Sequence, residues 1–348
     1  PREDPRVKAL IVRLSSIGDV VHTLPTLAAL RQHGWEPGWI VEPPGRVLLE
    51  GNPALQQVVA TPAATAFRWS EARSALRDLR RQRYDVALEF QGLWKSAAWA
   101  RLAGARRVVG FARPWRREPA SALLIGEQVE LPPGREHVID KNLSLLGPLG
   151  IEATGLREFP LPYSEEIAVR VAGGLRDLSV EDFVILNPAG GWESKLWPAE
   201  RFGELAQGLR RRGLSTVVTW GPGEEDLADR VVASSDGAAV RSFPTTLLDY
   251  VELARRARLV TAADTGPLHL ACAVGTPVVA LFGPTDPARN GPFDPSDEVV
   301  RRTPVCAPCY SRTCQRHAGV MAEIPVAEVL NAVVRRLASA RERESHAL

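Results

Sequence analysis

Short apolar runs alternate with longer amphipathic segments along most of this 348-residue chain. The runs are rich in valine, leucine and isoleucine, which is typical of parallel strands buried on both faces. Between the runs, apolar residues recur at helical spacing. The pattern predicts strands at residues 7–14, 39–41, 57–60, 86–89, 108–110, 183–187, 215–220, 238–240 and 278–282, with a further run ending at 260. It predicts helices at 20–32, 70–83, 137–149, 165–178, 199–212, 227–233, 246–256, 268–273 and 326–340, with a frayed end after 340.

The alternation is interrupted once, at residues 160–179, which combine prolines, charges and a Gly-Gly pair. A chain of this length is expected to form two domains. Alternating strands and helices predict a parallel sheet covered on both faces in each of them. We therefore expect an α/β protein with two doubly wound domains whose strand ends line one cleft. The expected parts are residues 1–163, a linker at 164–180, a second domain at 181–324 and a C-terminal helix at 325–348.

Residues 259–287 form the most informative stretch, because they contain a strand, a loop, a helix and a second strand in succession. Ligands of such units bind outside the carboxyl ends of the strands. The loop there offers the Thr265 hydroxyl, the Thr265 and Gly266 amides and a helix N-terminus, which together suit a phosphate group. Asp264 and Thr265 would equally serve as ordinary helix caps, so these residues alone leave both interpretations open.

Two other loops after predicted strands carry candidate chemistry. Lys195 follows a glycine-containing loop and is one of only four lysines, so its ammonium is placed to bind phosphate, although a solvated lysine is the alternative. In the first loop, Gly18 allows close backbone approach, while Asp19 stands at a helix start, where an acidic residue is also simply stabilising. The glycine pattern of dinucleotide-binding proteins is absent.

Composition narrows the class of protein. A net charge of +2 and 45% hydrophobic residues are ordinary for a soluble globular enzyme. No run reaches the ~18 consecutive apolar residues of a membrane span. The charged N-terminus predicts no signal peptide, and the four cysteines favour a cytosolic location. No Asp-x-Asp pair supports a magnesium–diphosphate clamp, and no nucleic-acid partner is expected.

Several longer segments of the sequence resemble those of one known family. The chain resembles glycosyltransferase family nine, the bacterial ADP-heptose:lipopolysaccharide heptosyltransferases. The Gln-Gly-Leu-x-Lys-Ser-Ala and Arg-Glu-Pro stretches look most like heptosyltransferase I, which adds the first heptose to Kdo on lipid A. The matching segments, in family order, are IVRLSSIGDVVHTLPTLAALR, YDVALEFQGLWKSAAWARL, RREPASALL, NPAGGWESKLWPAERFGELAQGL, GPGEED and TAADTGPLHLACAVGTPVVALFGPTDPARNGPF.

The resemblance implies a GT-B fold and an inverting, metal-independent transfer with no required cofactor. It assigns Asp19 as the general base and Lys195 to the diphosphate of ADP-heptose. It places Asp264 near heptose hydroxyls and Thr265-Gly266 on phosphate. The remaining donor-side candidates are His269, which would equally be a satisfied helix histidine, Glu225 for the ribose hydroxyls with Glu224 as the register alternative, and Ser16 and Gly18.

The implied acceptor, a Kdo-lipid A type molecule, is anionic. Lys95, Arg113, Arg116, Arg117 and the basic helix at 70–83 would form its receiving surface, although a basic helix is often only a solvated face. The implied location is cytoplasmic and peripheral, at the cytoplasmic face of the inner membrane.

The cysteines depart from the family pattern. Some family members carry four cysteines in this region, the last just before a methionine, whereas here Val320 precedes Met321. Cys306, Cys309 and Cys314 with His317 would make a Cys₃His site for structural zinc or iron, and a metal-free loop with free thiols is the alternative. Two other functions stay open for the whole chain: transfer from another nucleotide sugar or to another acceptor, and a non-catalytic scaffold that binds a nucleotide sugar.

Overall fold

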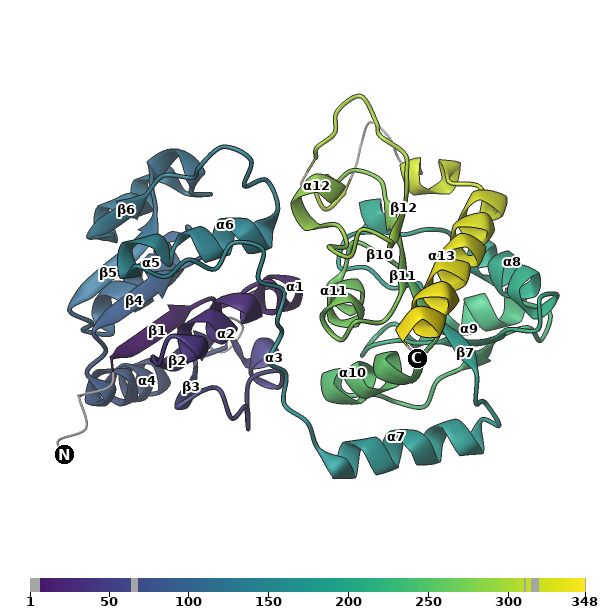
Figure 1. The fold of residues 1–348 in the computed structure, drawn as a ribbon, viewed down its shortest axis with the longest axis horizontal. Coiled ribbons are helices and arrows are strands. Elements are labelled where there is room, and N and C mark those ends of the chain that lie inside the picture. Colours follow the sequence, from purple (N-terminus) through teal and green to yellow (C-terminus); the bar gives the residue numbers. More distant parts are fainter. Residues whose placement is uncertain (1–6, 64–67, 310, 314–318, 348) are drawn as a thin grey trace. The chain divides into compact units, whose positions relative to one another are not determined.

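The structure is a computed structural model that describes residues 7–63, 68–309, 311–313 and 319–347. The chain divides into two compact units, Pro1–Tyr163 and Ser164–Leu348. Within the described residues, each unit is built on a six-stranded, wholly parallel sheet with helices on both faces (Figure 1). The predicted α/β class with two doubly wound sheets is confirmed.

The first unit has the strand order β3-β2-β1-β4-β5-β6. Its strands are β1 (Lys8–Val12), β2 (Glu36–Val41), β3 (Gln57–Ala60), β4 (Val86–Glu89), β5 (Arg107–Phe111) and β6 (Glu127–Val129). The central strands β1 and β4 are almost entirely buried, which explains why they appear in the sequence as unbroken apolar runs.

Helices cover both faces of this sheet. Apolar side chains of α4 and α5 pack with Leu10, Val12 and Ala87 into one core on one face. On the other face α2 packs against β2 and α6 packs against α2. The helices of the first unit are α1 (Ile17–Val21), α2 (Leu24–Gln32), α3 (Pro43–Arg46), α4 (Trp69–Gln82), α5 (Trp94–Leu102) and α6 (Val138–Ser144), with short 3₁₀ turns η2 (Arg113–Trp115), η3 (Pro119–Leu124) and η4 (Gly147–Leu149).

The second unit repeats the topology with the order β12-β11-β10-β7-β8-β9. Read from the other edge, this is the same order of chain connections as in the first unit. Its strands are β7 (Phe183–Asn187), β8 (Ser215–Val218), β9 (Val240–Arg241), β10 (Leu259–Ala263), β11 (Val278–Phe282) and β12 (Glu298–Arg301).

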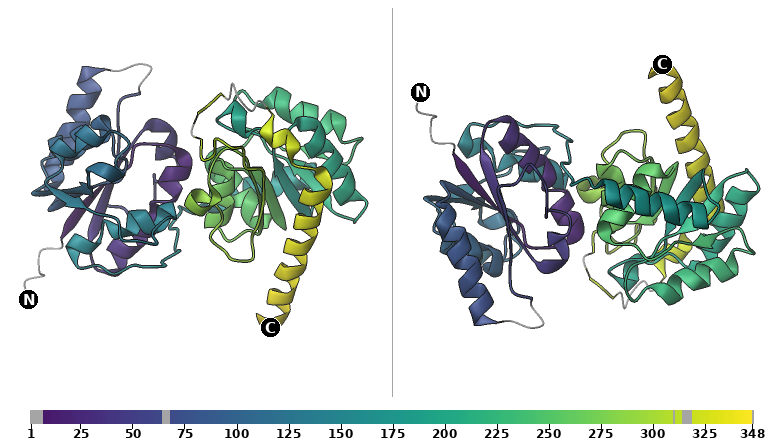
Figure 2. Two further views of the ribbon diagram at one scale, coloured as in Figure 1. Left: turned by 90° about the horizontal axis from the view of Figure 1, so that it is seen from above. Right: turned by 90° about the horizontal axis from the view of Figure 1, so that it is seen from below.

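One face of the second sheet packs against α8, α9 and α13, whose core includes Trp197, Phe202 and Val333. On the other side α11 packs against β10, β11 and α10, and α10 packs against α7. The C-terminal end of α13 projects beyond the rest of its unit (Figure 2). The helices are α7 (Glu165–Asp177), α8 (Ala199–Arg210), α9 (Glu225–Ser234), α10 (Leu247–Arg256), α11 (Gly266–Ala273), α12 (Pro287–Asn290) and α13 (Val326–Ala347), with η5 (Glu193–Lys195) and η6 (Val320–Glu323).

The differences from the predicted elements have local causes. The helix expected at 20–32 is divided into α1 and α2, because Pro25 cannot donate a backbone hydrogen bond to the preceding turn. The helix expected to reach 149 ends at Ser144, shortly before Gly147-Pro148. The C-terminal helix continues to Ala347 instead of fraying after 340. Strands β6 and β12 were not predicted, because short edge strands with charged residues carry no apolar run.

Both sheets change winding direction between two central strands. In the first unit this switch lies between β1 and β4, and in the second between β7 and β10. In doubly wound sheets the ligand crevice opens at the carboxyl ends of these strands. The loops after β1, β4, β7 and β10 are therefore where each unit is expected to bind its ligand.

Candidate functional site

Asp264 is the first residue after β10 and is only 4% exposed. Its Oδ2 atom accepts hydrogen bonds from Lys195 Nζ at 2.7 Å, Thr285 Oγ1 at 2.8 Å and Asn290 Nδ2 at 3.0 Å. Its Oδ1 atom lies 3.1 Å from Asn290 Nδ2 and 3.2 Å from His269 Nε2. We call these five residues the Asp264 cluster. The cluster joins the loops after β7, β10 and β11 at the switch point of the second sheet.

The charge state of Asp264 follows from these contacts. Burial alone would raise the pKa of the carboxyl group, because it disfavours the ionised form. The hydrogen bonds and charges of His269 and Lys195 outweigh that effect and hold the pKa of Asp264 well below its usual range. Asp264 is therefore a permanent anion at neutral pH, and its oxygens are occupied by protein donors.

Lys195 ends η5 in the loop after β7, and its side chain is 13% exposed. Nζ also donates to the Asp264 backbone oxygen at 3.0 Å and lies 4.4 Å from the centre of the Trp192 ring. A lysine ammonium has three N–H donors, so these two hydrogen bonds leave one for a ligand. The ammonium is held at a fixed point by Asp264 instead of moving freely in solvent.

Thr265 and Gly266 lie beside this ammonium. Thr265 is the N-cap of α11, which begins at Gly266, and its hydroxyl donates to Ala263 O at 3.2 Å. The oxygen of that hydroxyl keeps lone pairs for a further donor, and the first turn of α11 presents backbone N–H groups. A Cβ atom on Gly190 would lie 3.6 Å from Thr265 Cγ2 and 3.1 Å from Leu196 Cδ2, so the glycine lets the loop after β7 pack closely on this turn.

The two candidate carboxylates after β8 differ in their contacts. Glu224 Oε2 accepts from Gly221 N at 2.7 Å and so closes the loop after β8. Glu225 begins α9, is half-buried, and has no recorded hydrogen bond or ion pair among the described residues. Of the two, Glu225 keeps its acceptor capacity for a ligand.

In the first unit, Asp19 lies in α1, in the loop region after β1. Its Oδ2 atom accepts from both the backbone N and the hydroxyl of Ser16 at 3.1 Å. Its Oδ1 atom lies 3.7 Å from Nη2 of Arg13, whose side chain is buried. The Asp19 side chain is 36% exposed, so a carboxylate with defined orientation reaches the surface at the switch point. Gly18 is buried within α1.

The basic residues expected to receive an acceptor fall into two groups. Arg113 and Arg117 are exposed, and Lys95 is exposed and ion-paired with Glu42. Arg116 departs from the prediction: its guanidinium is fully buried, 2.7 Å from Glu89 Oε2, and donates to Ser121 Oγ and Phe111 O. Arg116 therefore holds the loop together and does not belong to the surface, because its charge is neutralised inside the fold.

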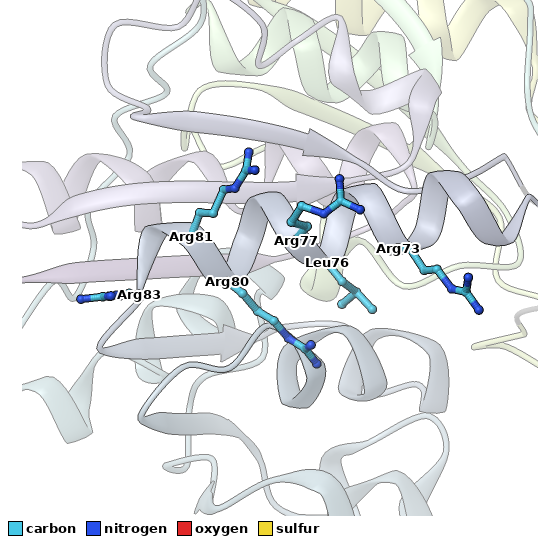
Figure 3. A pocket seen from close by; sticks show the side chains of 6 residues that line it. All are labelled: Arg73, Leu76, Arg77, Arg80, Arg81 and Arg83. Carbon is cyan, nitrogen blue, oxygen red and sulfur yellow. The ribbon is translucent and has the colours of Figure 1, made fainter.

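The basic helix predicted at 70–83 is α4. Its outer face and the residue after it form a shallow hollow of about 580 Å³ that is lined by five arginines and Leu76 (Figure 3). Arg80 donates to Leu102 O and Arg81 lies 3.7 Å from Asp78. Among the described residues, no partner is recorded for the guanidinium groups of Arg73, Arg77 and Arg83.

The cysteine loop is only partly described. Cys306 and Cys309 are half-buried free thiols, whereas Cys314 and His317 lie outside the described residues. Within the described part of the chain, no group of three or more metal-ligating side chains comes together. The same residues contain no helix with both the length and the hydrophobicity that a bilayer span requires.

Several residues with defined contacts at these sites were not singled out from the sequence. Thr285 and Asn290 follow β11 and meet Asp264 only through the fold. Arg13 flanks the loop that carries Asp19. Gln91, which the sequence offered only as part of the Gln-Gly-Leu-x-Lys-Ser-Ala stretch, donates to Ser15 in that loop. Glu89 did carry a signal, since a glutamate at the end of an apolar, fully buried strand requires a partner.

Comparison with known proteins agrees with this geometry. Residues 72–318 match the family described as glycosyltransferase family 9 (heptosyltransferase). The chain is 31% identical over 330 residues to lipopolysaccharide heptosyltransferase 1 of Pseudomonas aeruginosa, covering 88% of this chain and 87% of that protein. It is 30% identical over 312 residues to the protein of the same name in Escherichia coli K12, covering 85% and 93%. Among solved structures, the E. coli heptosyltransferase WaaC with ADP superposes with a TM-score of 0.71 at 25% identity, covering 97% of this chain and 98% of that one.

Proposed function

The chain belongs to glycosyltransferase family 9, and from this membership we propose that it transfers heptose from ADP-heptose to a Kdo-containing acceptor of the lipopolysaccharide core. Membership of this family establishes that the protein is a glycosyltransferase with the GT-B architecture of two Rossmann-like units. The observation that carries the proposal further is the Asp264 cluster, which fixes a lysine ammonium beside a helix N-terminus at the switch point of the second sheet. That arrangement suits the diphosphate of a nucleotide sugar.

On the donor side, Lys195 supplies its remaining N–H to the diphosphate, together with the N–H groups at the start of α11. The Thr265 hydroxyl joins them when its proton turns from Ala263 O toward a phosphate oxygen. Glu225 accepts from the ribose hydroxyls, for which a carboxylate is well suited. Five protein contacts already occupy the Asp264 oxygens, so its first role is to hold Lys195 and the loop after β11. A direct contact with heptose hydroxyls would require one of these donors to move.

On the acceptor side, Asp19 acts as the general base. It takes the proton of the acceptor hydroxyl while that oxygen forms a bond to the anomeric carbon of heptose. The bond from that carbon to the diphosphate breaks at the same time, ADP departs, and the configuration inverts. Ser16 orients the carboxylate, since both of its hydrogen bonds reach one oxygen and leave the other directed toward Arg13. The negative charge that develops on ADP is balanced by Lys195 and the α11 N-terminus, which makes the transfer independent of metal.

The test is transfer of radiolabelled heptose from ADP-heptose to a Kdo-lipid acceptor by the wild-type chain and by Asp19→Ala and Lys195→Ala. We expect Asp19→Ala to lower kcat by ~10²–10⁴-fold, in the range of general acid–base catalysis. Lys195→Ala should mainly weaken ADP binding. Asp182→Ala, which removes an exposed carboxylate paired with Arg258, is the matched control and should keep full activity. Unchanged turnover by Asp19→Ala would exclude it as the base, and a preference for UDP-, GDP- or TDP-sugars in competition would exclude ADP-heptose.

For the acceptor, we propose that α4 and the exposed arginines Arg113 and Arg117 face an anionic membrane surface at the cytoplasmic side of the inner membrane. Trp69, at the start of α4, is 73% exposed. Three arginines of the hollow (Figure 3) have no recorded partner within the described part of the chain. Each basic residue near an anionic bilayer contributes about 1 kcal/mol to binding. Flotation with vesicles containing anionic phospholipid should recover the wild-type chain and lose the triple variant Arg73→Gln, Arg77→Gln, Arg83→Gln. Equal recovery of the triple variant and the wild type with the anionic vesicles, or undiminished recovery of the wild type with neutral vesicles, would contradict an electrostatic contact.

A further inference from the structure

The buried ion pair between Glu89 and Arg116 has no place in the transfer chemistry. Both side chains are fully buried, and Glu89 Oε2 lies 2.7 Å from Arg116 Nη2. Glu89 ends β4, while Arg116 follows η2 after the neighbouring strand β5. Two charges are costly to remove from water unless they are paired and further hydrogen-bonded. The pair therefore holds together the loops after two adjacent strands at the sheet edge where ligands bind.

The second oxygen of Glu89 fixes the turn that follows β4. Oε1 accepts from Gln91 N at 2.9 Å, Gly92 N at 2.8 Å and Ser96 Oγ at 2.6 Å. Gly92 has a φ of +70°, and a Cβ there would lie 3.1 Å from the Arg116 backbone. The turn thus has one conformation, set by a buried carboxylate on one side and by the Arg116 backbone on the other.

This turn directs Gln91 at the loop after β1. Gln91 Oε1 accepts from Leu14 N at 3.1 Å, and Gln91 Nε2 donates to Ser15 Oγ at 3.3 Å. The next residue, Ser16, donates its N–H and its hydroxyl to Asp19. An unbroken series of contacts runs from Arg116 through Glu89 and Gln91 to the residues that orient Asp19.

We propose that Gln91 is a positioning residue for Asp19, held in place by the buried Glu89–Arg116 pair. The inference rests on the proposed role of Asp19 as the base. Gln91 touches neither substrate in this scheme. Its amide holds Leu14 and Ser15, and the next residue, Ser16, donates the hydrogen bonds that orient Asp19. A displacement of about 1 Å at a reacting group costs on the order of 10²-fold in rate.

Gln91 is the residue to change, because removing Glu89 or Arg116 would leave an unpaired buried charge and risk unfolding. Gln91→Met keeps the length of the side chain and removes both hydrogen bonds. Gln128→Met is the matched control, since Gln128 is an exposed glutamine on β6 whose amide, among the residues that the structure describes, donates to Ala122 O alone. Thermal melting of both variants establishes that they are folded.

Gln91→Met should lower kcat by about 10- to 100-fold, while the KM for ADP-heptose stays within about twofold of wild type. Gln128→Met should match the wild type in both. Single-turnover rates are measured with enzyme in excess for Gln91→Met, for Asp19→Ala and for the variant that combines them. Together with the wild type, these rates form a double-mutant cycle. If Gln91 acts through Asp19, Gln91→Met causes no further loss in the Asp19→Ala background.

The outcomes separate the two claims. A normal rate for Gln91→Met, or a loss that multiplies with that of Asp19→Ala, overturns the positioning role and leaves the base intact. A normal rate for Asp19→Ala overturns the proposed base itself, and the inference about Gln91 with it. A change in donor KM without a change in kcat would also overturn the positioning role.

Discussion

Lys195 Nζ lies 2.7 Å from Asp264 Oδ2, although 69 positions separate the two residues in the chain. The contact is largely shielded from solvent, since the two side chains are 13% and 3% exposed. Removing one partner of such a pair strongly destabilises the folded protein, because the other charge is left buried without compensation. The contact that holds the ammonium in place for the proposed diphosphate thus also connects two loops of the second unit.

Asp264→Asn should change how stability depends on pH. Hydrogen bonds and charges hold the pKa of Asp264 below its unfolded value of about 3.9, despite burial. Its contribution to stability is therefore present above about pH 4 and is lost as the pH falls toward the folded value. Urea unfolding between pH 6 and pH 2 should show a shallower acid loss for Asp264→Asn than for wild type. Asp182→Asn, at an exposed ion pair, is the control and should follow the wild-type slope. A curve for Asp264→Asn that runs parallel to the wild-type curve would contradict a lowered pKa of Asp264 in the folded protein.

Asn290→Ala tests whether the loop after β11 is fastened to Asp264. The Asn290 amide reaches both carboxylate oxygens, and a hydrogen bond to a charged group contributes about 1.5–3 kcal/mol. We expect a loss of stability of that size in chemical denaturation, together with weaker ADP binding in calorimetry. Asn331→Ala, on the exposed side of α13, is the control and should change stability by less than about 0.5 kcal/mol. Stability and ADP affinity equal to wild type in Asn290→Ala would show that the contact is dispensable.

Glu225→Gln and Glu224→Gln distinguish the two registers for ribose binding. Glu224 already accepts from Gly221 N, whereas Glu225 has its acceptor capacity available. Glu225→Gln should weaken ADP binding about tenfold, equivalent to about 1.4 kcal/mol, and reduce the preference for ADP over 2′-deoxy-ADP. Glu224→Gln should keep that preference. If the effects are reversed in calorimetry, Glu224 is the ribose ligand.

Arg116→Met and Arg113→Met compare a buried and an exposed arginine of the same loop. Arg116→Met leaves Glu89 buried without its partner and should cost about 3–5 kcal/mol in urea unfolding. Arg113→Met should leave stability within about 0.5 kcal/mol of wild type and raise the KM for the anionic acceptor. The double variant Glu89→Gln with Arg116→Met should recover part of the loss. An Arg116→Met variant as stable as wild type would contradict the structural role of Arg116 as the buried partner of Glu89.

Much of the fold could be predicted because burial on both faces of a parallel strand leaves an unbroken apolar run. Strands β3, β4, β7 and β11 have the bounds that the apolar runs predicted. Edge strands such as β6 escape this signal, because one side faces solvent and tolerates Glu127 and Gln128. The division of the helix before Pro25 was not predicted, although the missing N–H is a property of that residue alone and would have indicated it.

For the site, the sequence by itself determined that Asp19, Lys195 and Asp264 follow strands, since each comes directly after or soon after an apolar run. Only the tertiary structure decided which side chains they meet. It brought Asn290 and Thr285 to Asp264, placed Gln91 against the loop that carries Asp19, and buried Arg116 against Glu89. The reason is physical: periodicity records whether a residue is buried, whereas the partner of a buried polar group depends on the order of strands in the sheet, which local sequence does not contain.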